Sequence, residues 1–169
     1  MIASLLSALV LTLARYPGDG PVASASRRYV VENETREQPS RAGNHHQLFV
    51  VERGSGTRRP LLEYRRQVTV AWAPDREAIA VTNEVGSTQT TLALFVLEGD
   101  GFRKLDVSEA LYASFPGLRG ELVPYLHVHL ELVGWRRDGV ECRLRAYAGT
   151  GPNVTRRYVV GVDGKAKRV

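Results

Sequence analysis

The stretch VAWAPDREAIAVT, residues 70–82, decides the fold predicted for this chain. Two short apolar runs are joined by Pro74 and Asp75, and Trp72 stands just before the turn. Apolar runs bounded by turn residues predict two β-strands in an antiparallel hairpin. A large aromatic side chain beside the turn is expected to pack this hairpin on a neighbouring one. Trp72, Pro74 and Asp75 are therefore predicted to be structural anchors.

Short β-rich runs separated by turn residues continue on both sides of this hairpin. Strands are predicted at 27–32, 48–53, 61–65, 68–73, 78–83, 90–98, 102–107, 122–133, 140–147 and 156–162, with a last short one near Lys167. Gly-Ser-Gly, Asp-Gly and Gly-Asp-Gly turns separate several of them. One short helix is predicted at 107–114, with Ser108 as its N-cap and Pro116-Gly117 as its stop.

A repeated arrangement of hairpins extends over the chain. Three segments share an apolar strand, a Gly-containing turn and a basic strand: LFVVERGSGTRRPLLEY at Leu48, LFVLEGDGFRKLDV at Leu94 and YVVGVDGKAKRV at Tyr158. Between them lie two Trp hairpins, the second of which carries Trp135, a further predicted anchor. This order predicts blade-like units that bury one another's faces.

The first of these units resembles one blade of a TolB-type (WD40-like, PD40) β-propeller. Trp72, Ala73, Pro74 and Asp75 match the turn signature of that family, and residues 94–103 match its second hairpin. The resemblance is good over 68–107 and weak over 130–169, where Arg137 replaces the Pro. It implies a blade and no chemistry.

The number of units limits the architecture, because a closed propeller has at least four blades. Residues 47–169 hold two to three blade-like repeats in a single β domain. The predicted fold is therefore mainly β, with antiparallel hairpins forming either a partial propeller or a twisted sheet or sandwich.

The N-terminal region predicts export. Residues 2–14, IASLLSALVLTLA, have the length of a signal-peptide core and are too short to span a bilayer. Ala23-Ser24-Ala25 is a cleavage signature, so residues 1–25 are predicted to be a signal peptide. No basic residue precedes the apolar run, unlike the usual pattern, and a buried helix is the alternative. Residues 26–46 then read as a strand and a polar loop, in a periplasmic or secreted protein that does not span the membrane.

The charge pattern argues against a nucleic-acid partner. The net charge is +5, and twenty of the 23 basic residues are Arg, often in adjacent pairs. Adjacent residues on a strand point to opposite faces, so these pairs form no continuous basic stripe.

Cys142 is the only cysteine, which excludes an internal disulfide, and its alternation with apolar neighbours predicts a buried packing residue.

The strongest candidate for chemistry is YLHVHLELV, where His127, His129 and Glu131 alternate on one face of a strand. Two His at this spacing and a carboxylate can hold zinc, with His45 or His46 as a further ligand. In the alternative, the three belong to a polar sheet face in which Glu131 pairs with Arg143 or Arg145 across the hairpin.

These patterns predict an exported, non-catalytic β-repeat protein that acts as a binding or structural module of the cell envelope. Nucleophile, phosphate-loop and His-Glu-x-x-His motifs are absent from the sequence, and no cofactor is expected. The partner is expected to be another protein or copies of the chain itself. Two alternatives stay open, a metal-dependent enzyme centred on His127 and His129 and a half-propeller subunit of a larger assembly.

Overall fold

The structure is a computed structural model that describes residues 13–36, 44–148 and 152–169. This part of the chain is mainly β, with 13 strands and two helices. The strands are β1 (Leu13–Tyr16), β2 (Val22–Ala23), β3 (Tyr29–Arg36), β4 (His45–Glu52), β5 (Arg58–Tyr64), β6 (Val68–Trp72), β7 (Ala78–Glu84), β8 (Gln89–Glu98), β9 (Gly101–Asp106), β10 (His127–Arg136), β11 (Gly139–Tyr147), β12 (Val154–Val160) and β13 (Ala166–Arg168). The helices are α1 (Val107–Ser114) and α2 (Leu118–Leu122).

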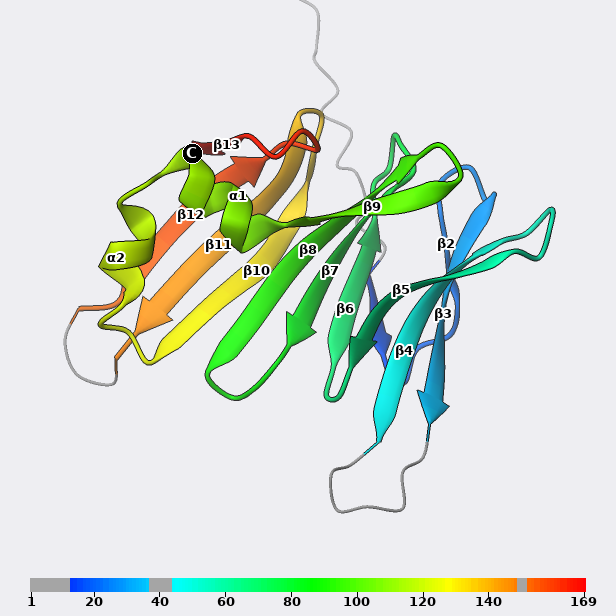
Figure 1. Ribbon diagram of the computed structural model, residues 1–169, viewed down its shortest axis with the longest axis horizontal. Helices are drawn as coiled ribbons and strands as arrows, with labels where there is room; N and C mark the ends of the chain where they lie inside the picture. The colour runs from blue at the N-terminus through cyan, green and yellow to red at the C-terminus, as the bar shows by residue number, and fades with distance from the viewer. Residues whose placement is uncertain (1–12, 37–43, 149–151) are drawn as a thin grey trace, which may run out of the picture.

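The strands form two sheets (Figure 1). The larger has the order β1-β6-β7-β8-β10-β11-β12-β13, with β9 also paired to β8, and the smaller has the order β2-β3-β4-β5. Every pair is antiparallel except β8 with β10. Three antiparallel meanders of four strands therefore follow one another along the chain: β2–β5, β6–β9 and β10–β13. The sheets do not close into a barrel.

Strand β8 changes its neighbour halfway along. Gln89 and Thr90 pair with Val128 and His129 of β10 in parallel, whereas the part from Ala93 onward pairs with β9. This two-residue pairing is the only β-ladder between the second and third meanders in the described chain, and we call it the β8–β10 junction.

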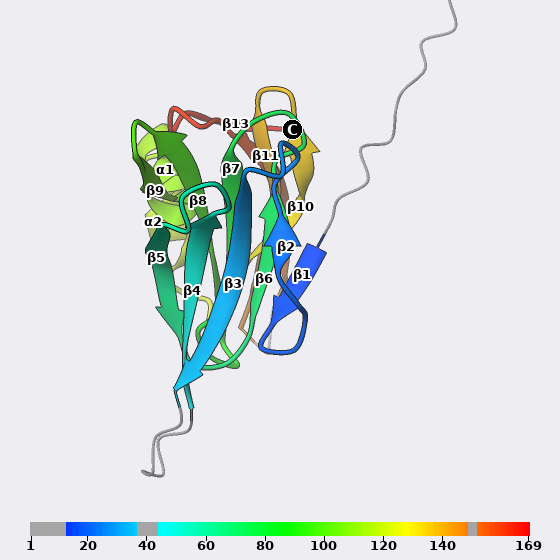
Figure 2. The same cartoon turned by 90° about the vertical axis from the view of Figure 1, so that its right-hand side faces the viewer.

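One apolar core lies between the smaller sheet, which faces the viewer in Figure 2, and strands β1 and β6–β8 of the larger sheet. Alternate residues of β6 point into it, and Trp72 among them is only 5% exposed. The Trp72 indole N–H donates to the Val22 carbonyl at 3.0 Å, and its ring packs edge-on against Phe102. The predicted anchor is therefore buried, and it joins β6 to β2 of the smaller sheet.

A second core contains the intervening residues of β6–β8, which are mostly alanine on β6 and β7. Trp135 of β10 packs in this core, and its indole N–H donates to the Ala71 carbonyl at 3.3 Å. Small side chains on β6 and β7 leave room for the indole ring to approach the backbone. Leu111 of α1 and Leu122 of α2 belong to the same core.

The turn with Pro74 and Asp75 also contacts the second Trp hairpin. The Asp75 carboxylate holds the Arg76 guanidinium at 2.9 Å, and Arg76 donates to the Arg137 carbonyl at 2.6 Å. Asp75 thus positions the arginine that links the turns of the two hairpins.

Within residues 13–25, β1 belongs to the larger sheet and β2 to the smaller one. Tyr16 on β1 is 1% exposed, and its hydroxyl lies 3.0 Å from the Gly20 carbonyl oxygen and 3.1 Å from that of Val31. Ser24, in the predicted cleavage signature, is buried and bonds with the backbone of Tyr29. Export remains a prediction. Most of the apolar run on which it rests, residues 2–14, lies outside the described residues. Cleavage after Ala25 would remove both β1 and β2.

Several local predictions need correction. Asp106, rather than Ser108, caps α1, because its carboxylate accepts from the backbone N–H groups of Ser108 and Glu109. The strand predicted at 122–133 begins only at His127, because α2 occupies 118–122. The predicted polar loop is shorter than expected, since β3 continues to Arg36 and β4 starts at His45. Residues 37–43 lie outside the described chain.

Candidate functional site

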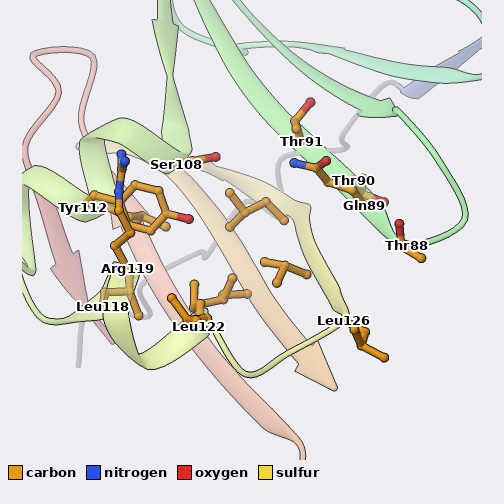
Figure 3. A pocket seen from close by; sticks show the side chains of 15 residues that line it. Thr88, Gln89, Thr90, Thr91, Ser108, Tyr112, Leu118, Arg119, Leu122 and Leu126 are labelled. Carbon is orange, nitrogen blue, oxygen red and sulfur yellow. The ribbon is translucent and has the colours of Figure 1, made fainter. Parts of the chain in front are cut away.

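A pocket of about 350 Å³ opens beside the β8–β10 junction, and we call it the helix pocket (Figure 3). Residues of α1 and α2 form one side and residues 88–91 of β8 and its preceding turn form the other. The apolar part of its lining consists of Leu111, Leu118, Leu122, Val123, Leu126, Val128, Leu130 and Leu144. Its volume is within the range of small-molecule sites, which starts at about 300 Å³.

The mouth of the helix pocket carries apolar side chains in contact with solvent. Val123 is 79% exposed and Leu126 is 72% exposed, on the segment that connects α2 to β10. Neighbouring Leu122 points into the core and is 7% exposed. An apolar rim that continues into an apolar floor is typical of a surface that receives an apolar group.

The polar part of the lining is made of uncharged groups and one arginine: Thr88, Gln89, Thr90, Thr91, Ser108, Tyr112 and Arg119. The hydroxyls of Thr88, Thr91, Ser108 and Tyr112 therefore line the same space. Burial raises the pKa of Tyr112, despite the opposing effect of Arg119, so this hydroxyl stays protonated at neutral pH. These groups can donate to or accept from a ligand.

Arg119 is already paired at the mouth of the helix pocket. One of its terminal nitrogens lies 2.8 and 3.0 Å from the two carboxylate oxygens of Glu109, and its guanidinium lies 4.6 Å from the centre of the Tyr112 ring. Both charged side chains are largely exposed. The only cation of the pocket lining is therefore balanced by an adjacent carboxylate.

The His face predicted from YLHVHLELV is present on the β10–β11 hairpin. His129 lies opposite Arg145, and Glu131 lies opposite Arg143, one of the two predicted partners. Glu131 accepts two hydrogen bonds from Arg143 at 2.6 and 2.9 Å, and Arg145 lies 3.3 Å away. On the other face, Leu130 and Leu144 are buried together with Cys142, for which burial was predicted, and Val128 and Leu132 pack beside them.

Both ring nitrogens of His129 are engaged by protein groups. Nδ1 lies 2.8 Å from the Thr90 hydroxyl, and Nε2 lies 3.2 Å from the Tyr147 hydroxyl. The ring of His127 stacks on Tyr147 with a centroid distance of 4.6 Å. The pKa of His129 is lowered, because the effect of burial is larger than the raising effect of the Glu131 carboxylate. Both ring nitrogens are thus already within hydrogen-bond distance of protein hydroxyls, which disfavours metal binding at this imidazole.

The other histidines lie on the other sheet. His45 and His46 are on β4, where the His46 Nδ1 lies 2.9 Å from the Thr35 hydroxyl and the ring stacks on Tyr64. Across residues 13–36, 44–148 and 152–169, no group of three or more His, Cys, Asp or Glu side chains is placed to hold a metal ion. A zinc site at His127, His129 and Glu131 stays a prediction, and the geometry favours the polar-face alternative.

Cys142 is buried in the core, and this burial raises the pKa of its thiol to about 12. The thiol is therefore protonated, and it is packed in the core as the sequence predicted.

Neither helix of the described residues is long and apolar enough to span a membrane.

The helix pocket was missed in the sequence, because its lining comes from five elements that are separate in the chain, β8, α1, α2, β10 and β11. One local signal was available, since Leu118 and Leu122 have the i, i+4 spacing of an apolar helix face.

In comparisons with known proteins, no family model, no curated protein and no solved structure matches this chain.

Proposed function

We propose that this chain is a non-catalytic binding module of the cell envelope and that the helix pocket takes up an apolar group of its ligand. The observation that carries the proposal is the pocket itself, with its exposed apolar rim at Val123 and Leu126 and its buried leucine floor. The location in the envelope is the expectation from the apolar N-terminal run.

Binding, rather than catalysis, fits the groups that line the pocket. Its polar side chains are hydroxyls, one amide and an arginine paired with Glu109, and no carboxylate, cysteine or histidine faces it. General acid–base catalysis needs a group with a pKa near the working pH, and nucleophilic catalysis needs an activated nucleophile. Thr90, the one lining residue bonded to a histidine, lies on the β8–β10 junction and helps to hold it.

The test is a fluorescence titration with N-phenyl-1-naphthylamine, an uncharged probe that brightens in apolar surroundings. The full chain should bind it saturably. Val123→Asp and Leu126→Asp, both at exposed positions, should weaken binding about tenfold or more by placing a charge at the apolar rim. Val85→Asp, at an exposed apolar position outside the pocket lining, is the matched control and should bind as the unmodified chain does. No saturable binding, or equal loss in the control, would refute the proposal.

A second candidate function is that of a blade-bearing subunit in an assembly of several copies. It is supported by the three consecutive four-stranded meanders, because blades of a propeller are four-stranded sheets and at least four are needed for closure. Native mass spectrometry of the protein tests it by counting copies, and the same spectrum reports bound zinc. A strictly monomeric species at micromolar concentration would contradict this second candidate.

A further inference from the structure

The helix pocket combines an apolar floor with a rim of uncharged hydrogen-bonding groups. Its floor is made by side chains that are almost fully buried, such as Leu111, Leu130 and Leu144. Hydroxyls of Thr88, Thr91 and the partly buried Ser108 and Tyr112 line the same space. A ligand that satisfies both parts has an apolar portion and a polar portion.

The charge at the rim discriminates between possible polar portions. A carboxylate or phosphate that enters the pocket must lose water and gain a cation in exchange, or binding is weakened. Arg119 is the only cation of the lining, and Glu109 holds it through two contacts at 2.8 and 3.0 Å. An anion would have to compete with Glu109 and would feel its repulsion.

The size of the pocket limits the apolar portion. A volume of 350 Å³ equals about 12 water molecules at about 30 Å³ each. A hydrocarbon chain of about eight carbons fits this space, with its polar end among the hydroxyls.

Resting on the proposed function, we infer that the ligand of the helix pocket is an uncharged amphiphile. It has one short hydrocarbon chain or an equivalent apolar group, and a head that carries hydroxyl, ether or amide groups. The hydrocarbon part of the ligand contacts the leucine floor. Its head forms hydrogen bonds with the hydroxyls that line the pocket, which belong to Tyr112, Ser108, Thr88 and Thr91.

The test is displacement of bound N-phenyl-1-naphthylamine from the full chain by two compounds with the same eight-carbon chain. Octyl glucoside, used below its critical micelle concentration, has an uncharged hydroxyl-rich head, whereas octanoate has a carboxylate. Octyl glucoside should displace the probe at a concentration at least about tenfold lower. Octanoate acting equally well or better would overturn the inference.

A substitution at Glu109 separates charge from shape. Glu109→Gln should release Arg119, so octanoate should gain about two- to fivefold in this variant while octyl glucoside stays unchanged, because an exposed ion pair contributes about 0.2–1 kcal/mol. Glu98→Gln, which breaks another exposed pair, with Arg103, is the matched control and should alter neither compound. An unchanged octanoate affinity in Glu109→Gln would overturn the role given to this ion pair.

The outcomes also distinguish this inference from the proposed function. If the probe binds saturably but neither eight-carbon compound displaces it, the ligand class is wrong and the binding function stands. If the probe itself does not bind, the proposed function fails and this inference fails with it.

Discussion

A chain that starts at Ser26 should be strongly destabilised relative to one that starts at Leu13. Residues 13–25 carry Tyr16 and Val22, which are 1% and 7% exposed. The loss of a buried aromatic side chain costs about 3–5 kcal/mol. A buried valine adds about 1.5–3 kcal/mol, so the total is about 5–8 kcal/mol. A typical domain has an unfolding free energy of about 5–15 kcal/mol, so the shortened chain should be unfolded or nearly so.

The lost hydrogen bonds act in the same direction. The Trp72 indole N–H loses the Val22 carbonyl, and the edge of β6 loses its pairing with β1. Urea unfolding followed by tryptophan fluorescence and circular dichroism measures the difference, with the chain from Leu13 as the matched control. Equal urea midpoints for the two chains would show that β1 and β2 contribute nothing to stability, and the reasoning would then be refuted. The predicted cleavage after Ala25 would generate this same shortened chain. The experiment therefore also measures how much unfolding free energy the protein would lose through that cleavage.

Three further perturbations follow from single contacts. Trp72→Ala should lower the unfolding free energy by about 3–5 kcal/mol in urea titrations, and a loss below about 1 kcal/mol would place the side chain outside the core. Gly139→Ala should lower the melting temperature by several degrees, because φ is +154° and the new Cβ would lie 2.2 Å from the Val160 carbonyl oxygen. An unchanged melting temperature would contradict this close approach of Gly139 to the Val160 backbone. Burial lowers the pKa of His129 below its ordinary 6.5, so the unfolded chain binds more protons just below that pH. The urea midpoint should therefore fall from about pH 7.5 to about pH 5.5, and less steeply in His129→Gln; equal slopes would contradict the assignment.

The strands were predictable because alternation and turn residues are local signals. The helix at 107–114 was found at its observed bounds, and Glu131 was correctly expected opposite Arg143 or Arg145. Matching of faces across a hairpin determines such a register, since a one-residue slip would bury the charges. Trp72 and Trp135, the two tryptophans predicted to be structural anchors, are both buried, and their anchoring role stays a prediction.

The remaining features depend on contacts between distant segments. Helix α2 has five residues, too few for a periodic pattern, and is stabilised by the core that Leu118 and Leu122 enter. Strand β2 has two residues and exists through its pairing with β3. The helix pocket forms only after β8, β10 and both helices have come together, so no single stretch of sequence encodes it.

The β8–β10 junction has a consequence for the order in which the molecule assembles. Hairpins within each meander join neighbours in sequence, whereas the junction closes a segment of about 40 residues through two residue pairs. The meanders should therefore form early on the folding pathway, and the junction should close last and open first. Hydrogen exchange at the Val128 amide, which donates to the Thr88 carbonyl, should report this opening. A molecule bound in the helix pocket touches both sides of the junction, and so it would act as a clasp that slows unfolding.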